Sequence, residues 1–426
     1  MLRKIFSSPL IAGSMVFFIG TMFINLGNYL YHLLMGRMLG PEGYGEFTSL
    51  ISLAYMLSIV ATTLLTTVVK FASIYKSKKD YSRVFSLFMN LTRIFLLIGT
   101  IVLLVFIAVR SQIAAFLNLS DSFPVILTGA WMFLSFLSFI NEGILRSFFK
   151  FGFLSLNAIL ATILKLSLAY FLVSFGYYVS GAIGAILLGS TLPYLLSFIP
   201  LRFLWKYYDP KKKVNWHDFS VFTFPVLLTT LGLTSLYSSD VILVKHFFSS
   251  YDAGLYACLA MLGKIIFFAS NVIPAVMFPI VAERHERGEE CKTVLKQSLM
   301  LVGGCSLAIT AIYFVVPQLM VRLLYGHSYL EAARYLGFFG VFISLYSICS
   351  LLANYFLSIG KTALGWLPVT AAFLQIILIW FLHKSIIQVV IISTLVVALL
   401  LISLLLYYLL NGKGQRSFSF CRYPRL

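Results

Sequence analysis

Long apolar runs recur along the whole chain, separated by short polar or basic segments. The runs extend for 20 to 27 residues, without the alternation of apolar and polar positions that is typical of barrel strands. A helix needs about 20 apolar residues to cross a hydrocarbon core of about 30 Å, and only helices or closed barrels pair all their backbone groups in lipid. The pattern therefore predicts an all-α polytopic membrane protein with about 12 transmembrane helices.

The boundaries of the apolar runs predict where these helices lie. In chain order, the expected spans cover residues 10–35, 47–69, 85–109, 123–145, 153–175, 179–204, 219–244, 255–281, 297–321, 332–357, 364–383 and 386–410. The first run is too long for the apolar region of a signal peptide and many spans follow it, so we expect it to be retained.

Composition supports this class of protein. Of the 426 residues, 60% are hydrophobic and 11% are charged, whereas soluble domains carry about a quarter charged residues. A soluble core of this chain length would not cover so much apolar surface. The five cysteines have neither paired nor metal-ligand spacing, so we expect no disulfide framework and no metal site.

The distribution of lysine and arginine predicts the orientation. The formal net charge is +18. With the N-terminus inside, 23 of the 32 basic residues fall on the cytoplasmic side and six on the outer side, and Arg93, Lys165 and Lys264 lie within spans. This excess places both termini in the cytoplasm and brings basic loops to anionic lipid headgroups. It is a topology signal, and we expect no nucleic-acid partner.

The chain also shows an internal duplication. The first span ends in a segment with Gly45 and Phe47, and the seventh ends in one with Gly254 and Tyr256, so that aligning these residues superposes the first two spans on the seventh and eighth. An even number of helices in each half gives parallel repeats related by a pseudo-two-fold axis along the membrane normal. We therefore predict two six-helix lobes, with the following boundaries: N-terminal lobe 1–205, basic cytoplasmic linker 206–218, C-terminal lobe 219–410, basic cytoplasmic tail 411–426.

Two short-looped helical lobes are typical of a transporter, and signatures of enzymes are missing. The sequence contains no Gly-x-x-x-x-Gly-Lys-Ser/Thr, no His-Glu-x-x-His and no Gly-x-Ser-x-Gly. His285-Glu286 and Glu289-Glu290 fall in a charged loop, where a solvated acidic run is the simpler interpretation. We expect no cofactor, and any uphill transport must draw on a gradient or on the membrane potential.

Ionisable residues within spans are the candidate substrate-binding groups, because each costs about 2.5–3.5 kcal/mol at the centre of a span. Lys165 lies roughly 18 Å from the inner end of its helix, at 1.5 Å per residue, on a face of small residues; it either lines a cavity or forms a structural ion pair. Lys264 and Asn271 share one face of the eighth span, although Lys264 is also able to extend toward the outer surface.

The remaining candidates are weaker. Arg93 is near enough to the inner end of its span to extend toward the surface. Asp240 is either a proton or cation site or, preferably, the partner of a lysine. Asn28 and His32 belong to a polar face of the first span that either lines a cavity or bonds neighbouring helices. Cations exceed acids within the spans, which suits an anionic, amphiphilic cargo.

The segment Leu39-Gly-Pro-Glu-Gly-Tyr-Gly-Glu-Phe47, its counterpart Asp252-Ala-Gly-Leu-Tyr256 and Glu142-Gly-Ile-Leu-Arg-Ser-Phe-Phe-Lys-Phe151 carry a family resemblance. They resemble the bacterial polysaccharide (O-antigen type, Wzx-like) flippases of the multidrug/oligosaccharidyl-lipid/polysaccharide exporter superfamily. The 6 + 6 plan extends this resemblance over essentially the whole chain. Lipid II flippases of the same superfamily typically have fourteen spans, which this chain is too short to hold.

The resemblance implies a flippase of the bacterial cytoplasmic membrane. It would move undecaprenyl-pyrophosphate-linked oligosaccharide from the inner to the outer leaflet by alternating access through a cationic cavity. Lys165 and Lys264 would then contact the pyrophosphate or acidic sugars, with membrane lipids and a coupling cation as further partners.

Two alternatives remain open at this stage. A cation-coupled multidrug exporter has the same plan, but it would need acids deep in the spans. A membrane glycosyltransferase or ligase would need catalytic residues in sizeable outer loops, and the predicted outer loops are short.

Overall fold

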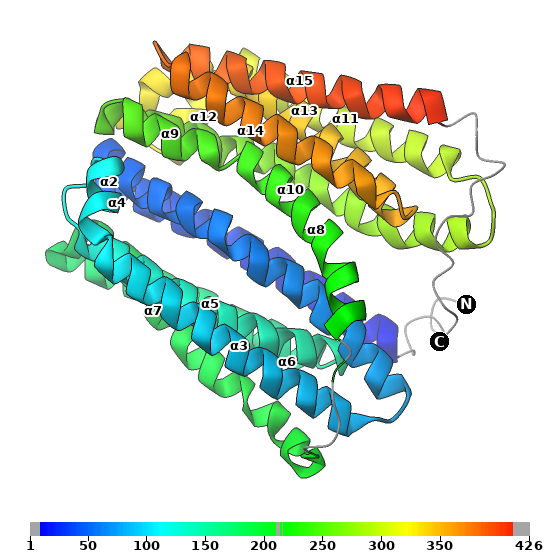
Figure 1. The fold of residues 1–426 in the computed structure, drawn as a ribbon. Helices are drawn as coiled ribbons and strands as arrows, with labels where there is room; N and C mark the ends of the chain where they lie inside the picture. Colours follow the sequence, from blue (N-terminus) through cyan, green and yellow to red (C-terminus); the bar gives the residue numbers. More distant parts are fainter. Residues whose placement is uncertain (1–8, 210–213, 215, 412–426) are drawn as a thin grey trace.

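The computed structural model describes residues 9–209, 214 and 216–411, and all regular structure in this part of the chain is helical. The helices form two lobes (Figure 1). The N-terminal lobe contains α2 (Pro9–Ser77), α3 (Tyr81–Ala108), α4 (Arg110–Phe116), α5 (Phe123–Ser147), α6 (Phe151–Leu172), η1 (Val173–Tyr177), α7 (Tyr178–Ser197) and η2 (Ile199–Tyr207). The C-terminal lobe contains α8 (Trp216–Leu236), α9 (Ser239–Phe247), α10 (Ser250–Glu286), α11 (Lys292–Val315), α12 (Pro317–Leu324), η3 (His327–Ala332), α13 (Ala333–Ser358), η4 (Thr362–Gly365), α14 (Trp366–Phe381) and α15 (Ile386–Asn411).

Ten described segments are long and apolar enough to cross a membrane, and two of them are long enough to cross it twice. Residues 23–77 and 151–197 span 55 and 47 residues, about double what one crossing requires. Each is bent by a glycine in the left-handed region, Gly40 at φ 67° and Gly176 at φ 88°, which residues with a Cβ rarely adopt. The ten segments therefore accommodate the twelve predicted crossings. The predicted linker lies partly outside the described residues. The predicted tail lies wholly outside them beyond Asn411.

Some predicted details were wrong. The segment after the first span was expected to be a loop, but the chain stays helical on both sides of Gly40, because one glycine makes the bend and Pro41 is tolerated in the first turn of the next helix. The seventh span is interrupted between Leu236 and Ser239. The ninth is interrupted at Val316, as the residue before a proline disfavours helical backbone.

The lobes meet at one end and diverge toward the other. We call the end where α2 begins and α15 ends the inner side, following the predicted orientation, and the end where α2 bends at Gly40 the outer side. Figure 1 shows the lobes close together near α4 and α9 and separated toward the inner side. One buried apolar cluster contains residues of both lobes, such as Phe47 and Tyr256. A second contains inner-side residues of the N-terminal lobe, together with Val214 and Phe219.

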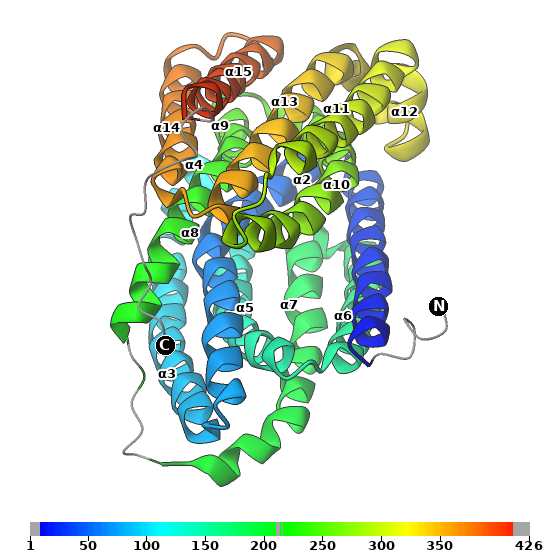
Figure 2. The same ribbon diagram turned by 90° about the vertical axis from the view of Figure 1, so that its right-hand side faces the viewer.

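Burial along α10 follows the same gradient. The outer residues 253–263 are all buried, whereas Phe268, Asn271, Val272 and Val276 of the inner half are exposed. On the inner side, α8 connects the lobes. Its first turns pack on α2, through the Phe71–Phe219 rings at 5.4 Å and a Thr223–Thr67 hydrogen bond of 3.2 Å. Figure 2 shows α8 on one flank and the first half of α2 on the other.

Candidate functional site

The two predicted lysines lie over tyrosine rings of α2. The Nζ atom of Lys165, on α6, lies 4.6 Å from the centre of the Tyr31 ring and donates a hydrogen bond to Asn28 Oδ1. The Nζ atom of Lys264, on α10, lies 4.9 Å from the centre of the Tyr55 ring. A cation over an aromatic face gains about 0.5–2 kcal/mol. Within the described part of the chain, neither lysine forms an ion pair.

The contact between Lys264 and Tyr55 joins the two lobes. It also joins equivalent positions of the two repeats, because both residues are related by the same offset of 209 residues that relates Gly45 to Gly254. Residues related by a two-fold axis touch only where they lie near that axis. Each is also 14 positions from the outer start of its helical segment, at Pro41 and Ser250, or roughly 21 Å at 1.5 Å per residue. This pair therefore lies centrally in the bundle.

His32 connects the two lysines to the outer side. Its buried ring interacts electrostatically with both Lys165 and Lys264, and its Nδ1 atom lies 3.3 Å from the hydroxyl of Tyr44. The cluster formed by Asn28, Tyr31, His32, Tyr55, Lys165 and Lys264 is called the central cationic cluster below. It brings together four of the seven predicted candidates from three helices.

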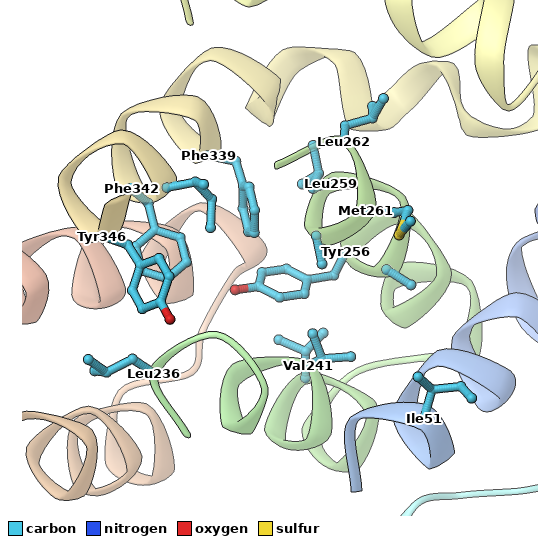
Figure 3. Packing of buried hydrophobic residues seen from close by; sticks show 14 of the residues in the cluster. Ile51, Leu236, Val241, Tyr256, Leu259, Met261, Leu262, Phe339, Phe342 and Tyr346 are labelled. Atoms are coloured by element: carbon cyan, nitrogen blue, oxygen red, sulfur yellow. The ribbon is translucent and has the colours of Figure 1, made fainter. Parts of the chain in front are cut away.

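Asp240 lies beside this cluster in the C-terminal lobe. It is 1% exposed, at the start of α9 just after the interruption in the seventh span. Its Oδ2 atom accepts a 2.6 Å hydrogen bond from the hydroxyl of Tyr256, and its charge interacts with that of Lys264 without a close ion pair. Figure 3 shows the Tyr256 ring between Phe339 of α13 and Val241 of α9.

The surroundings of Asp240 contain unpaired oxygen atoms. The side-chain oxygens Ser238 Oγ and Gln375 Oε1 are buried without a hydrogen-bond partner. Gln375 donates through Nε2 to the Leu236 carbonyl at 3.1 Å and to Ser393 at 2.9 Å. Buried polar oxygens are nearly always paired, so these two oxygens are acceptors available at or near the interrupted segment. The described residues contain no cluster of three or more His, Cys, Asp or Glu able to hold a metal ion.

Two candidates lie apart from the central cationic cluster. Arg93 is exposed on α3, on the same face as Leu97 and Ile101, which are 61% and 52% exposed. That face is largely apolar, as expected for contact with lipid. Asn271 is exposed on the inner half of α10, two turns from Lys264.

Hydrogen bonds between the lobes close the outer side. Arg37 donates to the carbonyls of Leu324 and Leu323 at 2.9 and 2.5 Å, and the Tyr329 hydroxyl donates to the Gly36 carbonyl at 2.7 Å. The hydroxyls of Tyr44 and Tyr325 are 3.1 Å apart. We call these contacts the outer seal.

A second group of contacts lies beside the outer seal. Asn118 donates to the His246 carbonyl at 2.9 Å, and the His246 ring stacks on Phe116 at 4.0 Å. Lys245 is fully buried and interacts electrostatically with Glu46, which accepts two hydrogen bonds from Ser120. The sequence pattern does not single out these residues or the tyrosines of the central cationic cluster. The only available signal was the helical spacing of Tyr31 with Asn28.

A comparison with family models decides the family. Residues 34–334 match the model described as "Polysaccharide biosynthesis protein". The chain belongs to this family. No curated protein sequence matches the chain.

Solved structures share its fold. An inward-facing multidrug resistance MATE family transporter of the MOP superfamily aligns with a TM-score of 0.74 and 15% identity, over 92% of this chain and 96% of that one. The lipid II flippase MurJ, in an inward closed conformation, aligns with a TM-score of 0.71 and 16% identity, over 92% of this chain and 87% of that one. An outward-facing MATE transporter aligns with a TM-score of 0.64 and 18% identity, over 97% and 98%. The family and the fold confirm the resemblance drawn from the sequence.

Proposed function

We propose that this protein is a flippase that moves undecaprenyl-pyrophosphate-linked oligosaccharide from the inner to the outer leaflet, for cell-surface polysaccharide biosynthesis. The observation that carries the proposal is the central cationic cluster, where Lys165 and Lys264 approach from different lobes without an ion-pair partner in the described chain. The polysaccharide biosynthesis family supports a glycan-related cargo. The similar fold of MurJ, which is named a lipid II flippase, supports a lipid-linked cargo.

The chemistry of the cluster suits a pyrophosphate. A phosphate oxygen accepts charge-assisted hydrogen bonds from ammonium groups, and these are strong in a site with little water. The tyrosine rings hold the lysines in place without neutralising them, so that the charge stays available to the cargo. Asn28 and His32 add further polar groups, and Asn271 extends the polar face of α10 inward.

The arrangement of the lobes supports alternating access. The outer seal is closed while the inner halves diverge, so the cargo enters from the inner side. Because Lys264 and Tyr55 belong to different lobes, a phosphate that draws Lys264 away from the ring changes a contact between the lobes. A ligand shifts a conformational equilibrium only through such differential contacts.

A coupling cation would bind at Asp240. Its burial and the unpaired oxygens of Ser238 and Gln375 favour a proton or a monovalent cation there. The same observation favours the second candidate function, a cation-coupled exporter. We also propose that the protein resides in a bacterial cytoplasmic membrane with both termini in the cytoplasm, because the basic residues are concentrated on that side.

The proposal is tested with purified protein in liposomes that contain a fluorescent polyprenyl-pyrophosphate oligosaccharide. The expected result is protein-dependent transfer of the glycan between leaflets, measured by its accessibility to an added glycosidase, with no transfer of a neutral fluorescent phospholipid. Cation-driven dye efflux without glycan transfer would instead establish the exporter.

A further inference from the structure

An open groove lies at the inner end of the N-terminal lobe, far from the central cationic cluster. It has a volume of about 380 Å³ and is lined by Phe198, Arg202 and Trp205. The groove belongs to η2, the short helix that directly follows the last span of this lobe. None of these residues takes part in the transport mechanism proposed above.

Aromatic contacts fix η2 against the inner ends of the spans. Leu201 and Leu204 are fully buried on one side. Trp205 packs on the rings of Phe85 and Phe88, both at 5.9 Å, and Tyr207 lies 5.0 Å from Tyr81. The η2 helix is therefore packed firmly against the N-terminal lobe, and the groove is a fixed surface.

The other side of η2 combines exposed aromatic and basic groups. Trp205 is 48% exposed, and Arg202 and Lys206 are exposed beside it. In the described part of the chain, Arg202 has no carboxylate partner. Tryptophan and tyrosine are enriched at the membrane–water interface, and an arginine there attracts anionic headgroups.

An apolar track leads from the groove along α7. Its exposed residues recur with helical spacing on one face: Leu188, Leu192 and Leu195 of α7, followed by Ile199 of η2. Such a stripe next to exposed basic side chains matches a molecule with a phosphate at one end and acyl chains at the other.

We propose that Arg202, Trp205 and Phe198 bind the phosphate headgroup of an anionic phospholipid of the inner-side leaflet, with its acyl chains along the α7 track. Arg202 would contact the phosphate, and the two aromatic rings would enclose the glycerol region. Free phosphate has no acyl chains to occupy the α7 track. The track therefore favours a phospholipid over free phosphate.

Native mass spectrometry of the full-length protein in detergent tests the site, with phosphatidylglycerol and phosphatidylcholine of identical acyl chains as probes. We expect preferential retention of phosphatidylglycerol, and Arg202→Gln should weaken its apparent affinity about fivefold, as one interfacial arginine contributes on this scale. Arg202→Lys should keep most of the affinity. Arg287→Gln, which removes an exposed arginine near the inner end of α10, should have no effect.

Equal retention of the two lipids would overturn the proposal, as would equal weakening by Arg202→Gln and Arg287→Gln. Displacement of the lipid by millimolar inorganic phosphate would also overturn it, because the acyl track would then contribute nothing. Circular dichroism and size-exclusion chromatography of each variant distinguish loss of the site from loss of the fold.

Discussion

Gly45 and Gly254, the equivalent glycines of the two repeats, lie back to back where α2 crosses α10. A Cβ atom on Gly45 would lie 2.8 Å from the backbone nitrogen of Gly254, and one on Gly254 would lie 1.9 Å from the carbonyl oxygen of Pro41. Real Cβ atoms do not approach backbone so closely, so only glycine permits this crossing. The lobes thus pack backbone against backbone at this crossing on the outer side.

Gly254→Ala should therefore separate the helices and destabilise the closed outer side. We expect a loss of about 1–3 kcal/mol, typical of overpacking, measured as a lower Tm in detergent. Gly303→Ala is the matched control, because its Cβ would meet nothing within 4 Å and alanine favours a helix interior. A Tm for Gly254→Ala at or above that of Gly303→Ala would contradict the crossing.

The outer seal should control access to Cys258. This thiol is fully buried in the outer half of α10, near Tyr44 and Tyr325 of the outer seal. In a variant with Cys258 as its sole cysteine, a membrane-impermeant maleimide added outside should label it slowly. Arg37→Gln removes two hydrogen bonds across the seal and should increase labelling severalfold.

Arg110→Gln serves as the control for this measurement, since it removes an exposed arginine on the outer end of the N-terminal lobe. Fast labelling of the parent protein, or no increase with Arg37→Gln, would show that these bonds do not hold the seal closed.

The ring of Tyr55 should matter more than its hydroxyl. Tyr55→Phe keeps an aromatic face for Lys264, whereas Tyr55→Leu removes it, at a cost of about 0.5–2 kcal/mol. We expect the leucine variant to show roughly fivefold weaker glycan transfer and the phenylalanine variant to resemble the parent. Equal activities of the two variants would mean that the ring does not position the lysine.

Asp240→Asn should uncouple transport from the ion gradient that drives it. The neutral amide cannot bind a cation as a carboxylate does, so transfer should no longer respond to an imposed proton or sodium gradient, while slow equilibration continues. Glu142→Gln is the control, because that acid pairs with Arg146 at 2.5 Å on the inner end of α5. A full response to the gradient in Asp240→Asn would exclude this residue as the coupling site.

Much of the fold could be predicted because membrane insertion depends on local sequence. Twenty apolar residues define a span regardless of their neighbours, and Gly40 and Gly176 fall where the predicted spans change direction. The interruption of the seventh span was missed, because hydropathy averages over the polar Ser238-Ser239-Asp240 segment. Whether such a segment stays helical depends on tertiary partners such as Gln375, 139 positions from Leu236.

The candidate site could be predicted only in part. Lys165 and Lys264 stand out because an isolated charge in an apolar run is costly wherever it lies. Tyr31 and Tyr55 do not stand out among 24 tyrosines, and their role depends on contacts between distant helices. Arg93 shows the converse: a charge within a span that extends from a lipid-facing surface rather than into the bundle.

The most direct test of the account compares Lys165→Gln, Lys165→Arg and Arg93→Gln in the glycan-transfer measurement, at matched protein levels in the same liposomes. We expect at least a tenfold lower initial rate for Lys165→Gln, substantial activity for Lys165→Arg and an unchanged rate for Arg93→Gln. An unchanged rate for Lys165→Gln, or an equal loss for Arg93→Gln, would contradict a central cationic cluster that binds the cargo.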